Sequence, residues 1–394
     1  MSDSLLLERA LGTFAVDDLV ARGFTRRGLF RVAALIGAGA ALPFGSEHAL
    51  AQLSDAGRIP DDAVKINANE FPEGPSKRAL AALAQVAKNG NRYQYPATAA
   101  LVTTAAELEG LEPANFAVYP GSSLALHHAV IAFTSPARAL VMADPGYEAA
   151  ANAAEFIGAK VVRVPLRPDG SHDLPAMLTA AKTEPAGLFY VCNPNNPTGT
   201  VTPRGQIEAL LAEKPAGSMV LIDEAYIHFC DEPPAADLVR AGKDVVVLRT
   251  FSKVYGMAGL RAGFALGRRD LLDRMTGWGT GALPVTAMAA AHAMLLERDL
   301  VPARKRRNAE RRADLMRFFD AHGFTHTASV SNKLMVDARM PTTQVIEGLK
   351  LRKVYVGRPW PIWPTHVRVS IGSDDDMKRF RSAFLAVTAA ARAG

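Results

Sequence analysis

The stretch Val245-Val246-Val247-Leu248-Arg249-Thr250-Phe251-Ser252-Lys253 decides the fold class. Its apolar, β-branched beginning is typical of a buried parallel strand, and its polar end closes on a lysine. In open α/β sheets, the crevice beyond the carboxyl ends of the strands binds ligands. We therefore expect an α/β fold with a mainly parallel sheet and with Lys253 at its ligand-binding edge.

Two earlier strands end in the same way. Asn196 follows the apolar run 188–191, and Asp223 follows the apolar run 219–222. Because parallel strands end at the same edge of a sheet, one crevice should receive an amide, a carboxylate and an amine.

This set of groups suits pyridoxal phosphate. The Lys253 amine can form a Schiff base with the cofactor aldehyde, and the Asp223 carboxylate can keep the ring nitrogen protonated, so that the ring accepts carbanion electrons. Asn196 and Tyr226 can donate hydrogen bonds to the ring oxygen.

The phosphate of such a cofactor would also find partners. Arg261, Thr250 and Ser252 offer donors for it. A small-residue turn that contains Ser122 and Ser123 precedes an expected helix, whose free backbone N–H groups suit an anion.

These motifs resemble those of fold-type I pyridoxal-phosphate enzymes, in particular the histidinol-phosphate aminotransferase-like branch of the class I and II aminotransferases. The resemblance extends from residue 66 to residue 372. It rests on the runs 67–70, 95–96, 121–123, 145–147, 193–199, 223–226, 250–253, 259–263 and 367–372. It implies a large cofactor-binding domain with a mainly parallel sheet and a smaller α+β domain.

The resemblance also implies further roles. Tyr147 would stack on the cofactor ring, and Tyr95 would reach the phosphate in the neighbouring subunit of a homodimer. Arg368 would bind the α-carboxylate of the substrate, with Arg358 and Asn332 in the same pocket. Lys253, Asp223 and Tyr226 would be the catalytic residues.

The expected reaction is a ping-pong transfer of an amino group between an amino acid and a 2-oxo acid. The same scaffold could instead support a decarboxylase, a lyase, a racemase or an oxidase, because the cofactor performs the chemistry and the pocket selects the bond.

The expected substrate pocket departs from the family pattern. Glu73 stands near a phosphate-binding position, which favours a free amino acid, with or without a basic side chain, over a phosphorylated substrate. Lys333 and Arg358 favour an anionic substrate group, so the substrate class stays open at this point.

The N-terminal residues resemble a twin-arginine export signal. Arg26-Arg27 precedes the mild apolar stretch 32–42, and Ala49-Leu50-Ala51 has the small-x-small pattern of a cleavage site. The stretch is shorter than the ~20 residues that span a bilayer, so we expect no stable membrane insertion. The segment predicts transport of the folded protein by the twin-arginine translocase to the periplasm.

The expected organisation is a signal peptide over 1–51, an arm with part of the small domain over 52–94, a large domain over 95–284 and a small domain over 285–394. Formal net charge is +6, and the densest basic run, 304–307 with Arg311 and Arg312, is expected to be the solvated face of a helix. No nucleic-acid-binding signature accompanies that run, and the two cysteines have no metal-ligand spacing, so we expect neither nucleic-acid binding nor a metal.

Overall fold

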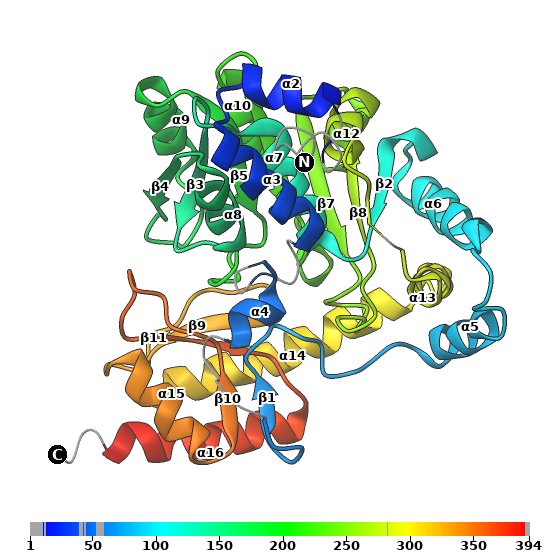
Figure 1. Ribbon diagram of the computed structural model, residues 1–394. Coiled ribbons are helices and arrows are strands. Elements are labelled where there is room, and N and C mark those ends of the chain that lie inside the picture. Colours follow the sequence, from blue (N-terminus) through cyan, green and yellow to red (C-terminus); the bar gives the residue numbers. More distant parts are fainter. Residues whose placement is uncertain are drawn as a thin grey trace.

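The computed structural model describes residues 11, 13–38, 42, 45–52, 59–281 and 283–390. A seven-stranded sheet forms the centre of the large domain, in the order β2-β8-β7-β6-β5-β3-β4 (Figure 1). Its strands are β2 (Phe116–Tyr119), β3 (Ala139–Asp144), β4 (Val161–Pro165), β5 (Ala186–Cys192), β6 (Met219–Asp223), β7 (Val245–Thr250) and β8 (Gly263–Gly267).

The strands β4, β3, β5, β6 and β7 are parallel, whereas β8 is antiparallel to both of its neighbours, β7 and β2. Every residue of β5, β6 and β7 is buried, which explains why their sequences are continuously apolar rather than alternating. The α/β fold with a mainly parallel sheet is therefore confirmed, with strands close to their expected positions.

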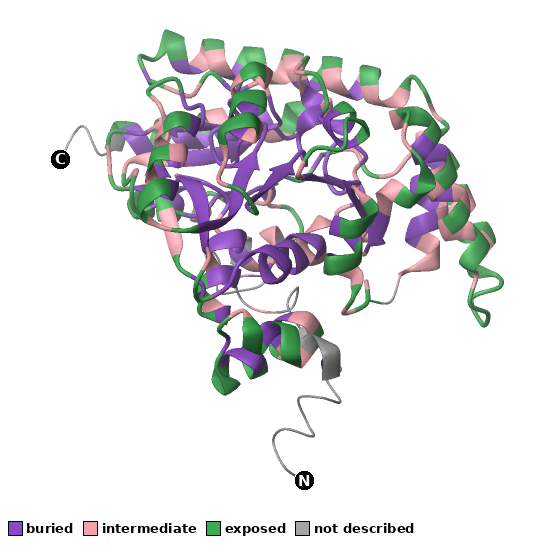
Figure 2. Cartoon of the chain, turned by 90° about the horizontal axis from the view of Figure 1, so that it is seen from above, coloured by how far each residue is buried: buried purple, intermediate pink, exposed green. Residues whose placement is uncertain are grey.

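Helices cover the two faces of the sheet, as Figure 2 shows by the buried strands between more exposed helices. The connecting helices are α7 (Ser122–Phe133), α8 (Ala149–Ile157), α9 (Leu174–Thr183), α10 (Arg204–Glu213), α11 (Ala236–Arg240) and α12 (Arg269–Thr276), with short 3₁₀ turns at Pro113–Asn115 and Ile227–Phe229. The helix α7 is buried over nearly its whole length, because other helices cover the side that faces away from the sheet.

Three helices form a group beside the sheet: α5 (Lys77–Ala87), α6 (Tyr95–Glu109) and α13 (Val285–Leu295). The helix α5 begins where the Ser76 side chain accepts a hydrogen bond from the backbone N–H of Ala79. Pro96 in the first turn of α6 and the left-handed Gly110 at its end are typical start and stop residues.

The small domain has its own apolar core. The strand β1 (Val64–Ile66) pairs in parallel with β10 (Val354–Val356), and β9 (Lys333–Asp337) pairs antiparallel with β11 (His366–Ser370). The helices α14 (Leu300–Ala321), α15 (Thr342–Lys350) and α16 (Asp374–Ala390) pack on these strands. Because β1 pairs with a strand from the far end of the sequence, the small domain is built from two separate parts of the chain, with the large domain between them.

The described part of residues 1–51, which we expect to be a signal peptide, is folded against the large domain. It forms α2 (Thr13–Ala21), α3 (Arg26–Ala38) and, with Gln52, α4 (Glu47–Gln52). Val32 and Leu35 have no exposed surface, because α3 packs against α7 and α8, and Leu19 of α2 is equally buried. No helix among the described residues has the length and apolar character that crossing a membrane requires.

Candidate active site

A cavity of about 480 Å³ opens at the carboxyl ends of β5, β6 and β7 and is bounded by residues of the N-terminal segment and of the arm 67–74. Its size falls in the range of small-molecule sites. Most of the residues predicted for the cofactor line it: Ser122, Ser123, Tyr147, Asn196, Asp223, Tyr226, Thr250, Ser252, Lys253 and Arg261. Side chains that lie far apart in the sequence thus line one cavity, as the positions of the strand ends predicted.

Lys253 lies just past β7, and its amine donates a hydrogen bond to the Ala68 carbonyl at 3.2 Å. Burial lowers the pKa of Lys253 to about 8, although the nearby Glu47 carboxylate raises it. Roughly a tenth of this amine is therefore uncharged at pH 7, far more than of a free lysine, and the uncharged form is the one that attacks an aldehyde.

Asp223 ends β6 and is fixed by two donors. The Tyr190 hydroxyl donates to one carboxylate oxygen at 2.9 Å, and the Ala225 backbone N–H donates to the other at 3.1 Å. Burial raises the pKa of Asp223, whereas these hydrogen bonds oppose the rise. A buried carboxylate held in this way can partner a protonated ring nitrogen.

The turn before α7 forms a cradle for an anion. Ser122 and Ser123 begin the helix, and the Arg261 guanidinium lies beside them, donating to the Ser252 hydroxyl at 3.3 Å. Gly121 has a φ of +85°, and a Cβ there would lie 2.3 Å from an Arg261 nitrogen. The glycine is therefore what lets the arginine reach the helix N-terminus.

Asn69 links the residues predicted to bind the ring oxygen. Its side-chain amide donates to Asn196 at 3.3 Å and to the Tyr226 hydroxyl at 3.1 Å. Asn69 has a φ of +53°, and the Ser370 hydroxyl donates to its side-chain oxygen. It belongs to the motif 67–70 that marked the resemblance, but the sequence assigned it no role.

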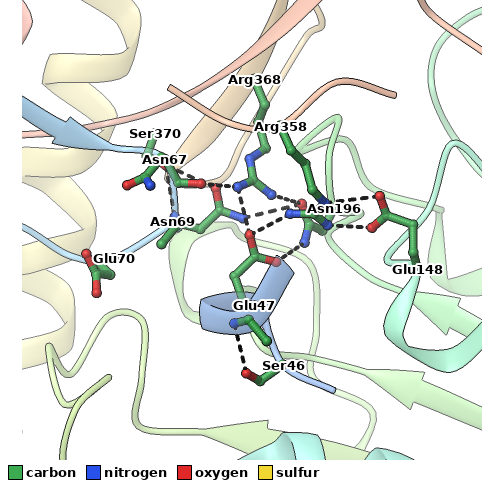
Figure 3. A network of polar contacts seen from close by, with 12 residues as sticks. Ser46, Glu47, Asn67, Asn69, Glu70, Glu148, Asn196, Arg358, Arg368 and Ser370 are labelled. Atoms are coloured by element: carbon green, nitrogen blue, oxygen red, sulfur yellow. Dashed lines mark hydrogen bonds and ion pairs between the residues drawn. The ribbon is translucent and has the colours of Figure 1, made fainter. Parts of the chain in front are cut away.

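Two arginines of the small domain converge on one carboxylate (Figure 3). Arg368 and Arg358 lie 2.7 Å and 3.1 Å from the same Glu47 oxygen. Asn196 donates to the second Glu47 oxygen at 3.2 Å, and Arg358 also pairs with Glu148 of the large domain at 3.2 Å. Burial would raise the pKa of Glu47, but the two arginines lower it to about 2, so the group is ionised.

The donors in the cavity fit pyridoxal phosphate: a lysine amine with a lowered pKa, a buried carboxylate, and an anion cradle that an added Cβ at Gly121 would block. The sequence matches the family model described as aminotransferase class I and II over residues 61–384. The chain belongs to this family.

The relatives of this aminotransferase have related activities. It is 35% identical over 330 residues to histidinol-phosphate aminotransferase of Symbiobacterium thermophilum, covering 82% of this chain and 90% of the relative. It is 39% identical over 225 residues to an aromatic amino acid aminotransferase of Nocardia farcinica, covering 56% and 63%.

Among solved structures, histidinol-phosphate aminotransferase from Sinorhizobium meliloti in complex with pyridoxal-5'-phosphate superposes with a TM-score of 0.78 at 27% identity, covering 89% of this chain and 96% of that one. The chain is thus a pyridoxal-phosphate-dependent aminotransferase that moves an amino group between an amino acid and a 2-oxo acid. These comparisons favour transamination over decarboxylation, elimination, racemisation or oxidation.

The cofactor, when bound, supplies an aldehyde carbon and a ring that accepts electron density from the α-carbon of the substrate. Lys253 provides an uncharged amine that can take the proton from that carbon and return it. Asp223 would hold the proton of the ring nitrogen, and Asn196 and Tyr226 line the same cavity, where they could bind the ring oxygen. Tyr147, which is buried in the cavity wall, can cover the ring.

The structure places two of the predicted substrate contacts outside the cavity lining. The Glu73 carboxylate does not line the cavity, because Arg311 of α14 pairs with it at 3.0 Å and Arg307 lies 3.9 Å away. The Asn332 amide donates to the Asn69 carbonyl at 3.0 Å, so it supports the arm behind the cavity instead of facing a substrate.

Lys333 also lies outside the cavity lining. Its amine is 3.0 Å from the centre of the Tyr226 ring and donates to the Ser331 hydroxyl at 3.0 Å. Burial lowers its pKa far below the usual value. Because Lys333 does not line the cavity, a substrate anion bound there would not meet it, contrary to the expectation from the sequence.

The basic run on α14 is only partly the solvated face that we expected: Arg306 and Arg307 are exposed, whereas other arginines of the run are not. Arg304 is buried and donates to the Val254 carbonyl at 2.8 Å and to the Gly74 carbonyl at 2.6 Å. Arg312 donates to the Ser331 carbonyl at 3.1 Å. These arginines fix the loops around the cavity.

Proposed function

We propose that this aminotransferase acts on a free, unphosphorylated α-amino acid whose carboxylate binds between Arg368 and Arg358. The position of the Glu47 carboxylate carries this proposal. It is an ionised carboxylate in the cavity, in contact with both guanidinium groups. A planar carboxylate is the group for which the arginine fork is suited.

The charges around that position favour a single carboxylate. Apart from Glu47, Glu148 is the one carboxylate among the described residues that forms an ion pair with these two arginines, so the pair of arginines retains one positive charge. A phosphate monoester carries about −1.5 to −2 charges at neutral pH, which is more negative charge than this single positive charge can balance. Histidinol phosphate has such a group and no carboxylate, so it is the poorer match despite the names of the relatives. Glu73 pairs with Arg311 outside the cavity lining, so it gives no reason to expect a substrate with a basic side chain.

The test is a comparison of kcat/KM for histidinol phosphate, glutamate, phenylalanine and arginine, with one amino acceptor throughout. We expect the free amino acids to exceed histidinol phosphate. Arg368→Lys retains the charge but loses the fork, and should lower kcat/KM for amino acids by about ten- to hundredfold. A higher kcat/KM for histidinol phosphate in the unmodified enzyme would refute the proposal.

We also propose that the enzyme reaches the periplasm by the twin-arginine route. In support, the Arg26 and Arg27 side chains are exposed at the start of α3, where a receptor can reach them. Replacing both by lysine should leave folded precursor in the cytoplasm, whereas Arg31→Lys on the same helix should not. Normal export of the double variant, measured by cell fractionation, would exclude this route.

A further inference from the structure

The N-terminal cap, by which we mean the described residues between 11 and 52, has two points of attachment. The first is apolar: Leu19, Leu29, Val32 and Leu35 are buried where α2 and α3 cover the large domain. Arg22 strengthens it by donating to the Thr134 carbonyl at 2.7 Å, at the end of α7.

The second point of attachment lies inside the active site. Ser46 and Glu47 form part of the wall of the cavity that contains Lys253 and Asp223. Glu47 is held by Arg368, Arg358 and Asn196, so it occupies the position where a carboxylate would bind. Figure 3 shows α4 bringing Glu47 up to the arginines from the side opposite the small domain.

The two attachments involve different domains. The apolar one is on the large domain, whereas Arg358 and Arg368 belong to the small domain, in the loop before β11 and in β11 itself. The cap therefore connects the domains across the cavity. A carboxylate tethered in this way has an effective concentration of around the millimolar range, so a substrate carboxylate in solution has to compete with it.

We infer that the N-terminal cap is an internal competitive inhibitor, in which Glu47 takes the place of the substrate carboxylate until the cap is released. This inference rests on the proposed function, because it assumes that the substrate binds to the arginines through a carboxylate. Cleavage after Ala51, at the expected signal-peptide site, would separate Glu47 from the enzyme. The precursor is then a weak catalyst and the processed enzyme an efficient one.

The first test uses the full-length holoenzyme and Glu47→Gln, which keeps the side-chain shape and removes the charge. Asp17→Asn is the matched control, because Asp17 is an exposed carboxylate of the same cap. Calorimetric titration with 3-phenylpropionate, a carboxylate that cannot be transaminated, should give a Kd about tenfold lower for Glu47→Gln. Amino-acid KM should fall by a similar factor with kcat unchanged, as competition requires.

The second test avoids any substitution at Glu47. A protease site built into residues 53–58 allows the folded holoenzyme to be cut and the cap to be removed by gel filtration. We expect KM to fall after cleavage, and to rise again when a peptide of residues 11–52 is added. The same peptide with Gln at position 47 should have little effect.

The outcomes separate the inference from the proposed function. If Glu47→Gln and cleavage both leave the Kd for 3-phenylpropionate and the KM unchanged, the cap is not an inhibitor, even where free amino acids are good substrates. If the processed enzyme prefers histidinol phosphate but Glu47→Gln still binds 3-phenylpropionate more tightly, the proposed function fails, whereas Glu47 still blocks the anion position at the two arginines.

Discussion

At the scale of single residues, the site depends on burying groups that would be charged in water. Lys253 is the clearest case, because burial brings its pKa to about 8. Asp223 is affected in the opposite sense, since burial raises the pKa of an acid. The hydrogen bonds that Tyr190 and Ala225 donate to the Asp223 carboxylate oppose this rise in pKa. They keep the ionised carboxylate available to the cofactor ring.

The lowered pKa of Lys253 predicts the pH dependence of cofactor capture by the apoenzyme. Only the uncharged amine attacks the aldehyde, so the rate should be low at pH 6.5 and rise with a midpoint near 8. Glu47→Gln removes a carboxylate that raises this pKa, so its midpoint should be lower. Stopped-flow absorbance from pH 6.5 to 10.5 measures the midpoint for the unmodified apoenzyme and for Glu47→Gln. A midpoint close to that of free lysine, about 10.4, would show that Lys253 is not desolvated.

Asp223→Asn should bind the cofactor and lose most turnover, by about 100-fold or more, because a neutral amide cannot hold the ring-nitrogen proton. Tyr190→Phe removes a donor but leaves the carboxylate, so its loss should be much smaller. Cofactor absorbance confirms loading, and steady-state kinetics gives the loss. Near-normal kcat in Asp223→Asn would remove Asp223 from its role.

At the scale of elements, strand ends and helix starts position the chemistry. The sequence was sufficient for the parts that depend on local pattern: buried strands such as β7 are continuous apolar runs, and the polar residues that end them must share one edge of a parallel sheet. It was not sufficient for contacts between distant segments. The residues around Glu73 do not predict its ion pair with Arg311. In the same way, the residues around Asn332 do not predict its hydrogen bond to the arm at Asn69.

The N-terminal segment shows the same limit. A helix with arginines followed by small apolar residues is typical of an export signal, and such a pattern does not state what the helix contacts while it remains attached. The contacts of Glu47 with Arg368 and Arg358 join residues more than 300 positions apart, so only the folded chain reveals them.

The turn before α7 gives the prediction at this scale. Gly121→Ala forces a Cβ against the Arg261 guanidinium at a φ of +85°, and should weaken cofactor binding by about ten- to hundredfold through the loss of a charged donor. Gly205→Ala in α10, where a Cβ meets nothing within 4 Å, is the control. Equilibrium dialysis of the cofactor measures both. An unchanged Kd in Gly121→Ala would show that Arg261 does not bind the phosphate.

At the scale of the whole molecule, we propose a homodimer in which Tyr95 completes the site of the partner. The Tyr95 side chain is 77% exposed at the start of α6 and does not line the cavity of its own chain. Tyr95→Phe should therefore increase cofactor loss on dilution, whereas Tyr93→Phe, on the neighbouring exposed ring, should not. Light scattering of the purified enzyme gives its molecular mass and so distinguishes a dimer from a monomer. A fully active monomer would contradict this arrangement.

The central claim, that Lys253 is the lysine that binds the cofactor, has a direct test because the structure offers a second buried amine with a lowered pKa. That amine is Lys333, on the other side of the cavity wall and against the Tyr226 ring. Borohydride reduction of the holoenzyme, followed by proteolysis and peptide mass spectrometry, identifies which lysine carries the cofactor. The account predicts the label on the peptide that contains Ser252-Lys253-Val254, and a label on Lys333 or any other lysine would contradict it.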